Sequence, residues 1–321
     1  MTFRLDALPL LSRSTVEREE GLRDDRDRQV ELWQDGRVLL VDQYGRTPIN
    51  GAGSTLAHRP AKTFGSEPPP EALLLGEEDG AGYWAIQVDA EEPAGRLDWR
   101  GWQDIGSADP DEEKWLDLRG AGTYLDATYA GLFTTAVGLV NWHNRARFCA
   151  NCGSPVERVK AGWATHCTGC GREEYPRTDP AVICLVHDGP GDGTRVLLAR
   201  QPIWPRGRYS VLAGFVESGE SLEACVAREI GEEVGVDVTD IRYLGSQPWP
   251  FPRSLMLGFA AQASPDQPTV LQDGEIEEAR WVTRDELREA LAAEAAGTEH
   301  WLGLPGPTSI ARRMLESWAD A

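Results

Sequence analysis

Three glutamates in the second half of the sequence have the spacing of a metal-binding group. Glu229, Glu232 and Glu233 lie three and four residues apart, so a helix would place them on one side. Glu229 and Glu233 also share nearly the same bearing as neighbouring apolar residues, where uncompensated carboxylates are unfavourable. Hard oxygen ligands gathered in this way suit Mg2+ or Mn2+, which retain water and bridge phosphate groups. The alternative is a solvated acidic face, which ordinarily lies opposite the apolar residues of a helix.

Four of the six cysteines form a second group, with the spacing Cys149-x2-Cys152-x14-Cys167-x2-Cys170 and a glycine after each pair. Two C-x-x-C turns of this kind build a tetrahedral site of four thiolates that suits Zn2+. Four thiolates leave no position for water, so the zinc is expected to be structural. A redox pair is a poorer interpretation, because the second C-x-x-C would then have no role. A nucleic-acid-binding ribbon stays open as an alternative, since arginines flank the cysteines.

The overall composition limits the classes of partner. The 321 residues carry 52 acidic and 32 basic side chains, a formal charge of -20 that disfavours general attraction to nucleic acid. No stretch approaches the roughly 20 apolar residues that span a bilayer, and the N-terminus does not resemble a signal peptide. We therefore expect a cytoplasmic protein without a membrane partner.

The elements that must position these groups follow from hydrophobic patterns. In the last part of the chain, strands are expected at residues 181–186, 195–199, 209–213, 242–245 and 254–260, with helices near 221–234, 284–296 and 309–318. Alternating strands and helices predict an α/β or α+β fold for this part. Arg228 could orient the carboxylates of the helix through a bidentate ion pair.

Residues 1–145 read as a separate N-terminal α+β domain. Strand-like runs occur at 37–41, 71–75 and 82–88, and apolar residues at helical spacing run from 123 to 145. No catalytic constellation is visible there, and His143 is interpreted as a structural histidine. The predicted boundaries are an N-terminal domain at 1–145, a zinc ribbon at 146–175 and a catalytic domain at 176–321.

Residues 214–236 also match, without a gap, the signature G-x5-E-x7-R-E-U-x-E-E-x-G-U of the Nudix hydrolases, where U is a bulky apolar residue. The matching positions are Gly214, Glu220, Arg228, Glu229, Ile230, Glu232, Glu233, Gly235 and Val236. The chain from about 176 onward therefore resembles a Nudix hydrolase, an α/β/α sandwich that cleaves nucleoside diphosphates linked to another group. The resemblance implies that Glu229 and Glu233 bind metal, that Glu232 supports them, and that Glu220 and Arg228 hold the loop and helix together.

A second motif narrows the resemblance. On composition alone, the prolines and aromatic residues of Gln247-Pro-Trp-Pro-Phe-Pro-x-Ser254 form either a stacking surface for a base or a rigid connector. The string itself is similar to the specificity loop of the NADH pyrophosphatase branch, which also carries a four-cysteine zinc ribbon. Tyr175-Pro-Arg177, Glu275 with the residues up to Trp281, and Ile310-Ala-Arg-Arg313 follow the same branch.

This resemblance implies a set of ligands and contacts. The metal contacts are the Ala213 carbonyl, Glu229, Glu233 and Glu275. The substrate contacts are Tyr175, Gln247, Pro248, Trp249, Pro250, Phe251, Pro252, Arg253, Ser254 and Ala311. Members of the branch are typically homodimers with shared substrate sites, so a homodimer is expected.

The expected activity is hydrolysis of the pyrophosphate bond of NADH or NAD to NMN(H) and AMP, with Mg2+ or Mn2+ as the catalytic metal. Either Glu233 or Glu275 would act as general base. Three alternatives stay open: an ADP-ribose-type substrate, removal of NAD caps from RNA 5′ ends, and a zinc-ribbon scaffold with an inactive Nudix domain.

Overall fold

The computed structural model describes residues 3–12, 15–50, 55–89, 113–271 and 274–321, which divide into two compact units. The C-terminal unit consists of Met1–Leu10, Asp179–Pro248 and Ser254–Ala321. The N-terminal unit consists of Leu11–Thr178 together with Trp249–Arg253. Within the described ranges, none of the helices has the length and hydropathy needed to cross a bilayer.

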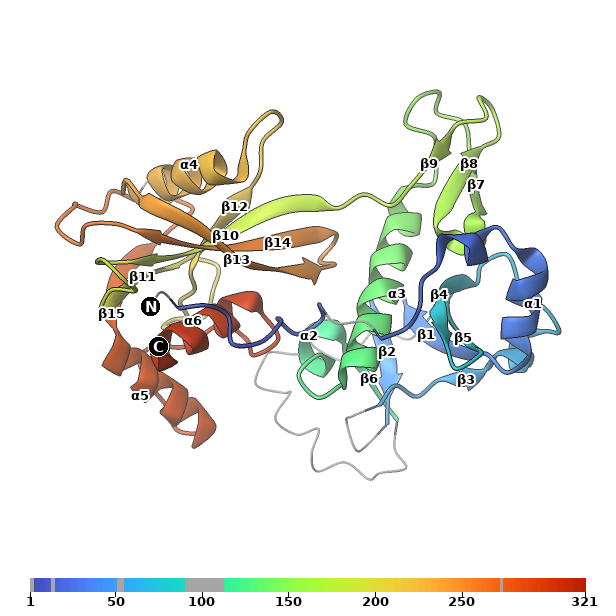
Figure 1. The fold of residues 1–321 in the computed structure, drawn as a ribbon, viewed down its shortest axis with the longest axis horizontal. Coiled ribbons are helices and arrows are strands. Elements are labelled where there is room, and N and C mark those ends of the chain that lie inside the picture. Colours follow the sequence, from blue (N-terminus) through green and yellow to red (C-terminus); the bar gives the residue numbers. More distant parts are fainter. Residues whose placement is uncertain (1–2, 13–14, 51–54, 90–112, 272–273) are drawn as a thin grey trace. The chain divides into compact units, whose positions relative to one another are not determined.

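The C-terminal unit is built on one six-stranded sheet (Figure 1). Five strands follow the order β13-β14-β10-β11-β15, and the sixth strand, β12, pairs with β10. The strands are β10 (Asp179–His187), β11 (Arg195–Arg200), β12 (Leu212–Phe215), β13 (Thr239–Trp249), β14 (Ser254–Gln262) and β15 (Glu278–Thr283). The helices are α4 (Leu222–Val234), α5 (Arg284–Ala295) and α6 (Ile310–Asp320).

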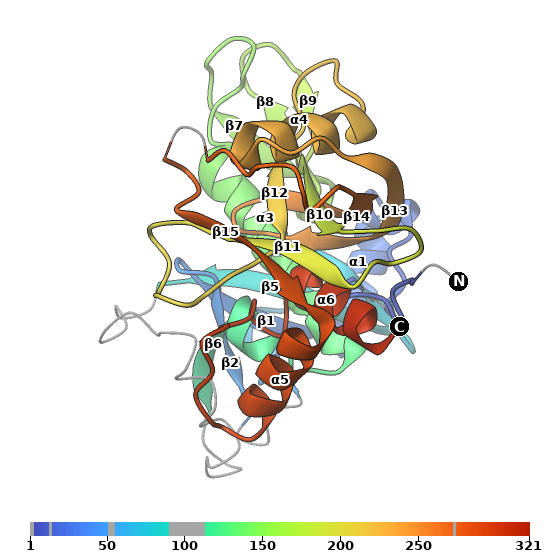
Figure 2. The same ribbon diagram turned by 90° about the vertical axis from the view of Figure 1, so that its left-hand side faces the viewer.

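Successive side chains of β10 point to opposite faces of this sheet and contribute to two separate hydrophobic cores. Ile183 and Leu185 pack with α5 and α6, whereas Val182, Cys184 and Val186 pack with α4. Figure 2 shows α4 on one side of the sheet and α5 and α6 on the other. The predicted α/β/α sandwich is therefore confirmed, and β10 is apolar almost throughout because both of its faces are buried.

The N-terminal unit also has helices on both faces of a sheet, with strand order β3-β1-β5-β4. Helix α3 packs on one face with the larger core of this unit, and α1 packs on the other around Trp33 and Trp84. The strands are β1 (Arg37–Asp42), β2 (Arg46–Ile49), β3 (Arg59–Pro60), β4 (Leu73–Glu78), β5 (Ala81–Val88) and β6 (Lys114–Asp117). The helices are α1 (Arg26–Gln34), α2 (Leu118–Ala121) and α3 (Ala127–Arg145), with 3-10 turns η1 (Glu20–Arg23) and η2 (Ala61–Phe64).

The cysteine region extends this unit as a three-stranded sheet of β7 (Val156–Val159), β8 (Ala164–Cys167) and β9 (Glu173–Glu174), with η4 at Lys160–Gly162. His143, at the end of α3, is buried and donates from its ring to the Gly162 carbonyl oxygen at 2.8 Å. Burial lowers the pKa of His143 to about 4, so the ring is neutral at pH 7. Its predicted structural role is confirmed.

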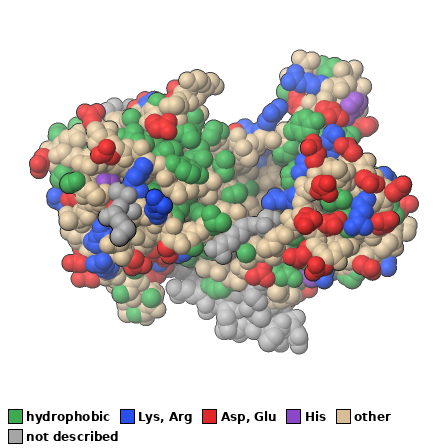
Figure 3. Space-filling view, in the orientation of Figure 1, with side chains coloured by type: hydrophobic (Ala, Val, Ile, Leu, Met, Phe, Trp, Pro, Cys, Tyr) green, Lys and Arg blue, Asp and Glu red, His purple; other side chains and the backbone are tan. Residues whose placement is uncertain are grey.

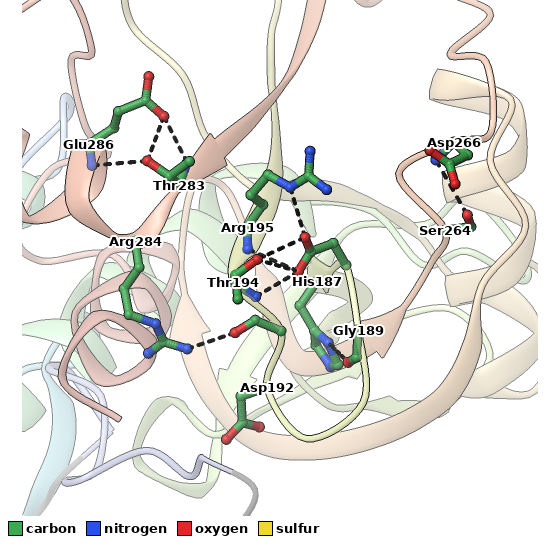
Figure 4. A network of polar contacts seen from close by, with 12 residues as sticks. His187, Gly189, Asp192, Thr194, Arg195, Ser264, Asp266, Thr283, Arg284 and Glu286 are labelled. Carbon is green, nitrogen blue, oxygen red and sulfur yellow. Dashed lines mark hydrogen bonds and ion pairs between the residues drawn. The ribbon is translucent and has the colours of Figure 1, made fainter.

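The turn between β10 and β11 is stabilised by Asp188. Its carboxylate accepts from the Thr194 N–H at 2.6 Å, the Arg195 N–H at 3.0 Å and the Arg195 Nε at 2.8 Å. Figure 4 shows Thr194 and Arg195 at this turn, with the His187 ring directed toward Gly189. Burial raises the pKa of Asp188, but these hydrogen bonds outweigh it and lower the value from 3.8 to about 2.

Replacing Asp188 with asparagine is therefore expected to lower the free energy of unfolding by about 2 kcal/mol at pH 7. The stabilisation by the ionised carboxylate is complete above its unfolded pKa of 3.8 and is lost as pH falls toward 2. Urea unfolding at several pH values measures the difference, which should shrink in acid. Asp266→Asn, at an exposed site, serves as the control and should change stability by less than about 0.5 kcal/mol. Equal effects of the two substitutions would contradict the assignment.

Candidate active site and zinc centre

Helix α4 carries Glu229, Glu232 and Glu233, and residues of the sequence define where it begins and ends. The Ser221 side chain caps the N-terminus by accepting from the Ala224 N–H, and Gly235 ends the helix in the left-handed region with φ 71°. Over this length, Glu229 and Glu233 lie one turn apart and project toward β12 and the loop that follows it.

Arg228 is the centre of an ion-pair network around this helix. Its Nε donates to Glu220 at 2.8 Å, and its Nη1 donates to both Glu229 and Glu232 at 2.9 Å. Its Nη2 also donates to the Phe215 carbonyl oxygen at 3.0 Å. The Arg228 hydrogen bond lowers the pKa of Glu220 to about 2, so this carboxylate stays ionised. One guanidinium thus ties the loop after β12 to the catalytic face of α4.

Glu233 is the unusual member of the set because its carboxylate is buried. The side chain is 6% exposed, and its Oε2 atom has no hydrogen-bond partner among the described residues. Burial raises the pKa of Glu233 to about 8, with further contributions from the charges of Glu275 and Glu229. A divalent cation would compensate both the burial and the repulsion, so the residues present fit such an ion.

The Glu229 carboxylate lies directly against the backbone of β12 at Gly214, which explains why this position is a glycine. A methyl group on Gly214 would lie 1.9 Å from the Glu229 carboxyl carbon, a contact that no side chain tolerates. Burial raises the pKa of Glu229 as well, while its ion pair with Arg228 opposes that shift. Gly214 is therefore required for the close approach of this carboxylate.

Replacing Gly214 with alanine is expected to displace the Glu229 carboxylate and lower kcat/KM by about a hundredfold. The matched control is Gly231→Ala in the same helix, where nothing lies within 4 Å of an added methyl group. That substitution should leave activity unchanged and stabilise the protein by about 0.5–1 kcal/mol. Steady-state kinetics and thermal melting of both variants test the difference, and full activity of Gly214→Ala would contradict it.

Glu275 is exposed and lies in a turn before β15. Its negative charge raises the pKa of both Glu229 and Glu233, which places it near them. In the described part of the chain, the carboxylate oxygens do not form a set of three within 4.8 Å of one another, whereas the cysteine sulfurs do. Ala213 completes the predicted ligand set from β12, and its N–H donates to Glu233.

The four cysteines form the second centre. The Sγ atoms of Cys149, Cys152, Cys167 and Cys170 all lie within 4.8 Å of one another. Backbone N–H groups of Gly169 and Cys170 donate to the Cys167 sulfur at 3.4 Å, as a thiolate ligand requires. The glycine after each pair is left-handed, with φ values of 73° and 72°. This geometry fits one structural Zn2+ in a ribbon.

The predicted substrate contacts are divided between the two units. Gln247, Pro248, Ser254 and Ala311 belong to the C-terminal unit, whereas Tyr175 and Trp249–Arg253 belong to the N-terminal unit. Gln247 is fully buried, and its amide joins β13 to α6 by donating to the Thr308 carbonyl at 2.8 Å and accepting from the Ile310 N–H at 2.7 Å. Tyr175 is 46% exposed, and its hydroxyl donates to Glu173 at 2.8 Å.

Sequence reasoning missed one residue beside the carboxylates. Phe215 ends β12 with its ring 59% exposed, and its carbonyl oxygen is held by Arg228. An exposed aromatic ring offers a stacking surface for a base. The available signal was a large apolar residue directly after Gly214, at the end of a short strand.

Three family models together match most of the chain between residues 28 and 302. Residues 177–302 match the model of the NUDIX domain, and residues 144–175 match the NADH pyrophosphatase zinc ribbon domain. Residues 28–142 match the NADH pyrophosphatase-like rudimentary NUDIX domain.

Several relatives share one description. The chain is 47% identical to the NAD-capped RNA hydrolase NudC of Mycobacterium bovis (strain BCG / Pasteur 1173P2), covering 99% of this chain and 96% of that protein. It is 46% identical to NudC of Mycobacterium tuberculosis (strain ATCC 25618 / H37Rv) with the same coverage. NudC of Stutzerimonas stutzeri is 42% identical over 65% of this chain and 69% of its own length.

Proposed function

This chain belongs to the zinc-ribbon Nudix hydrolases of the NADH pyrophosphatase type, and from that membership we propose that it hydrolyses the diphosphate bond of NADH and NAD. The products are AMP and reduced or oxidised NMN. The observation that carries the proposal is the buried carboxylate of Glu233, whose Oε2 atom has no hydrogen-bond partner among the described residues and whose pKa is raised further by the charges of Glu275 and Glu229. Such a group is unfavourable in the folded protein unless a bound cation compensates it.

The cation is proposed to be Mg2+ or Mn2+, held by Glu229, Glu233, Glu275 and the Ala213 carbonyl oxygen. When bound, it supplies charge neutralisation of the diphosphate and activation of the attacking water. The protein's own contribution is positioning: Arg228 fixes Glu229 and Glu232 while Glu220 anchors Arg228. This preformed network costs no reorganisation when charge develops on the phosphates.

The reaction needs one proton acceptor, and Glu233 and Glu275 are the candidates. The water oxygen bonds to one phosphorus as its proton passes to a glutamate, and the bond from that phosphorus to the bridging oxygen breaks. The electron pair of that bond stays on the leaving mononucleotide phosphate. Tyr175, Ala311 and the segment from Pro248 to Ser254 are proposed to bind the two nucleoside ends of the substrate, whereas the buried Gln247 amide links β13 to the start of α6.

Removal of NAD caps from RNA 5′ ends is the second candidate, because it breaks the same bond and the 46–47% identical relatives bear that name. The formal charge of -20 argues against extended phosphate contacts. Figure 3 shows acidic side chains over the visible faces of both units. The RNA substrate compatible with this acidic surface is one that places only its NAD-capped 5′ end at Glu229, Glu233 and Glu275.

The wider arrangement is also part of the proposal. We propose functional parts at 1–145, 146–175 and 176–321, and the residues of the three family-model matches, 28–142, 144–175 and 177–302, support this division. We also propose a homodimer. A cytoplasmic location would keep the four zinc thiolates reduced. One structural Zn2+ per chain is expected in the purified protein.

Substrate preference is tested by parallel reactions with NADH, NAD, ADP-ribose and an NAD-capped RNA, each with Mg2+ and with Mn2+. The rates of hydrolysis, measured by chromatography of the products, should be higher for NADH or NAD than for ADP-ribose. Cleavage of ADP-ribose alone would contradict the assignment of the segment from Pro248 to Ser254. Cleavage of the capped RNA alone would make this protein a decapping hydrolase, and no turnover would favour the scaffold alternative.

A further inference from the structure

The tip of the β13–β14 hairpin, Trp249–Arg253, belongs to the N-terminal unit, whereas the rest of the hairpin belongs to the C-terminal unit. We propose that Asn141 and Arg119 of the N-terminal unit are positioning residues that hold this tip in the shape that grips the nicotinamide ring. The inference rests on the proposed function, because it assumes that the tip contacts a dinucleotide substrate. It gives the N-terminal unit a role in specificity.

The sequence of the tip explains why it needs outside support. Three of the six residues from Pro248 to Arg253 are prolines, which lack an N–H, so the segment has few donors for its own carbonyl groups. One internal hydrogen bond is present, from the Phe251 N–H to the Trp249 carbonyl at 2.7 Å. The shape of the tip therefore depends on donors supplied by another element.

Asn141, in the last turns of α3, is such a donor. Its Nδ2 group donates to the Pro250 carbonyl at 2.8 Å and to the Pro252 carbonyl at 3.2 Å. These two carbonyls flank Phe251, so one amide fixes the backbone on both sides of an aromatic residue. Pro250 is itself buried, and a methyl group added to Gly138 of α3 would lie 3.9 Å from the Pro250 Cβ.

Arg119, at the start of α2, acts on the rings. Its guanidinium carbon lies 3.8 Å from the centroid of the Phe251 ring and 6.0 Å from that of Trp249. The two rings meet edge to face, with centroids 4.9 Å apart and an interplanar angle of 67°. Both rings are only partly buried against the core around α3, so part of their surface stays open to a ligand.

Together these contacts fix the tip before substrate binds. A loop ordered in advance loses less conformational entropy on binding, so its support affects the affinity for the part of the ligand that it grips. NADH and ADP-ribose share the diphosphate and the adenosine, but ADP-ribose lacks the nicotinamide ring. A residue that acts through the tip should therefore affect hydrolysis of NADH and spare hydrolysis of ADP-ribose.

The test compares Asn141→Asp with Asn144→Asp. Both add one negative charge to the same helix, but Asn144 is exposed and three residues further on. Asn141→Asp replaces the donor with an oxygen that repels both carbonyls, without a change in volume. We expect kcat/KM for NADH to fall at least about tenfold, mainly through KM, because two hydrogen bonds are lost. ADP-ribose hydrolysis should change less than about twofold, and Asn144→Asp should resemble the wild type.

Two further variants make the result decisive. Asn141→Gln, which keeps the amide donor, should recover part of the NADH activity. Arg119→Met, which removes the cation and keeps an apolar stem, should lower NADH hydrolysis selectively and carries the test if Asn141→Asp fails to fold. Equal losses on both substrates, or no loss on NADH, would overturn the inference. Failure of the wild type to cleave NADH would instead overturn the proposed function.

Discussion

Replacing Glu233 with glutamine is expected to lower kcat for NADH by at least about a thousandfold while the fold stays intact. Glutamine has nearly the same shape but carries no charge, so it cannot compensate a divalent cation or accept a proton. Glu223→Gln is the matched control, because Glu223 is exposed on the first turn of the same helix. Steady-state kinetics with saturating metal measure both variants, and normal activity of Glu233→Gln would refute the metal site.

The same substitution should have the opposite effect on stability when no metal is present. Burial raises the pKa of Glu233 from 4.5 to about 8, so the ionised form is unfavourable in the folded protein. The penalty grows as pH rises from 4.5 and reaches about 3 kcal/mol at pH 7. Metal-free Glu233→Gln should therefore be more stable than the wild type at pH 7.

Chelator-treated proteins unfolded in urea at several pH values test this reversal. The free energies of unfolding of the wild type and of Glu233→Gln should converge below pH 4, where the wild-type Glu233 carboxyl is protonated in both the folded and the unfolded protein. Adding Mn2+ should stabilise the wild type more than the variant, since only the wild type keeps the full ligand set. A variant less stable than the metal-free wild type at pH 7 would contradict the burial argument.

Replacing Cys167 with serine is expected to reduce bound zinc from about one ion per chain to less than about one tenth. Cys167 is 1% exposed, and two backbone N–H groups converge on its sulfur, so a neutral hydroxyl there leaves the ion with three thiolates. We expect the melting temperature to fall by at least about 10 °C, because zinc-binding energy is folding energy for a ribbon of this size.

Cys184→Ser provides the control for this loss. Cys184 is equally buried but lies in β10, away from the cysteine cluster. Its replacement should cost some stability and leave the zinc content unchanged. Elemental analysis of both purified proteins distinguishes the two outcomes, and full zinc in Cys167→Ser would refute the four-thiolate site.

The layers, the cysteine cluster and the placing of the three glutamates on one helix were predictable from sequence because their signals are local. The glutamates of α4 and the two C-x-x-C pairs carry their spacing within a few residues, and the buried strand β10 reads as an unbroken apolar run. The expected helix at 123–145 overlaps α3 at Ala127–Arg145. The expected strand at 209–213 lies instead at Leu212–Phe215, where its backbone pairs with β10.

The rest depended on contacts between distant residues. Strand β13 continues to Trp249, into the predicted loop, because pairing with β14 overrides the local preference of its prolines. Gln247 reads as a ligand contact, but its amide is used between β13 and α6. The contact of Asn141 with Pro250 joins residues 109 positions apart, and nothing near Asn141 indicates it. Such pairings arise from the tertiary fold and leave no local pattern.

The most direct test of the central claim is product analysis of NADH incubated with the protein and Mn2+, with and without chelator. The account predicts equal amounts of AMP and reduced NMN, formed only when the metal is present and only by protein with Glu233 intact. Metal-independent cleavage, cleavage by Glu233→Gln, or products other than these two mononucleotides would contradict it.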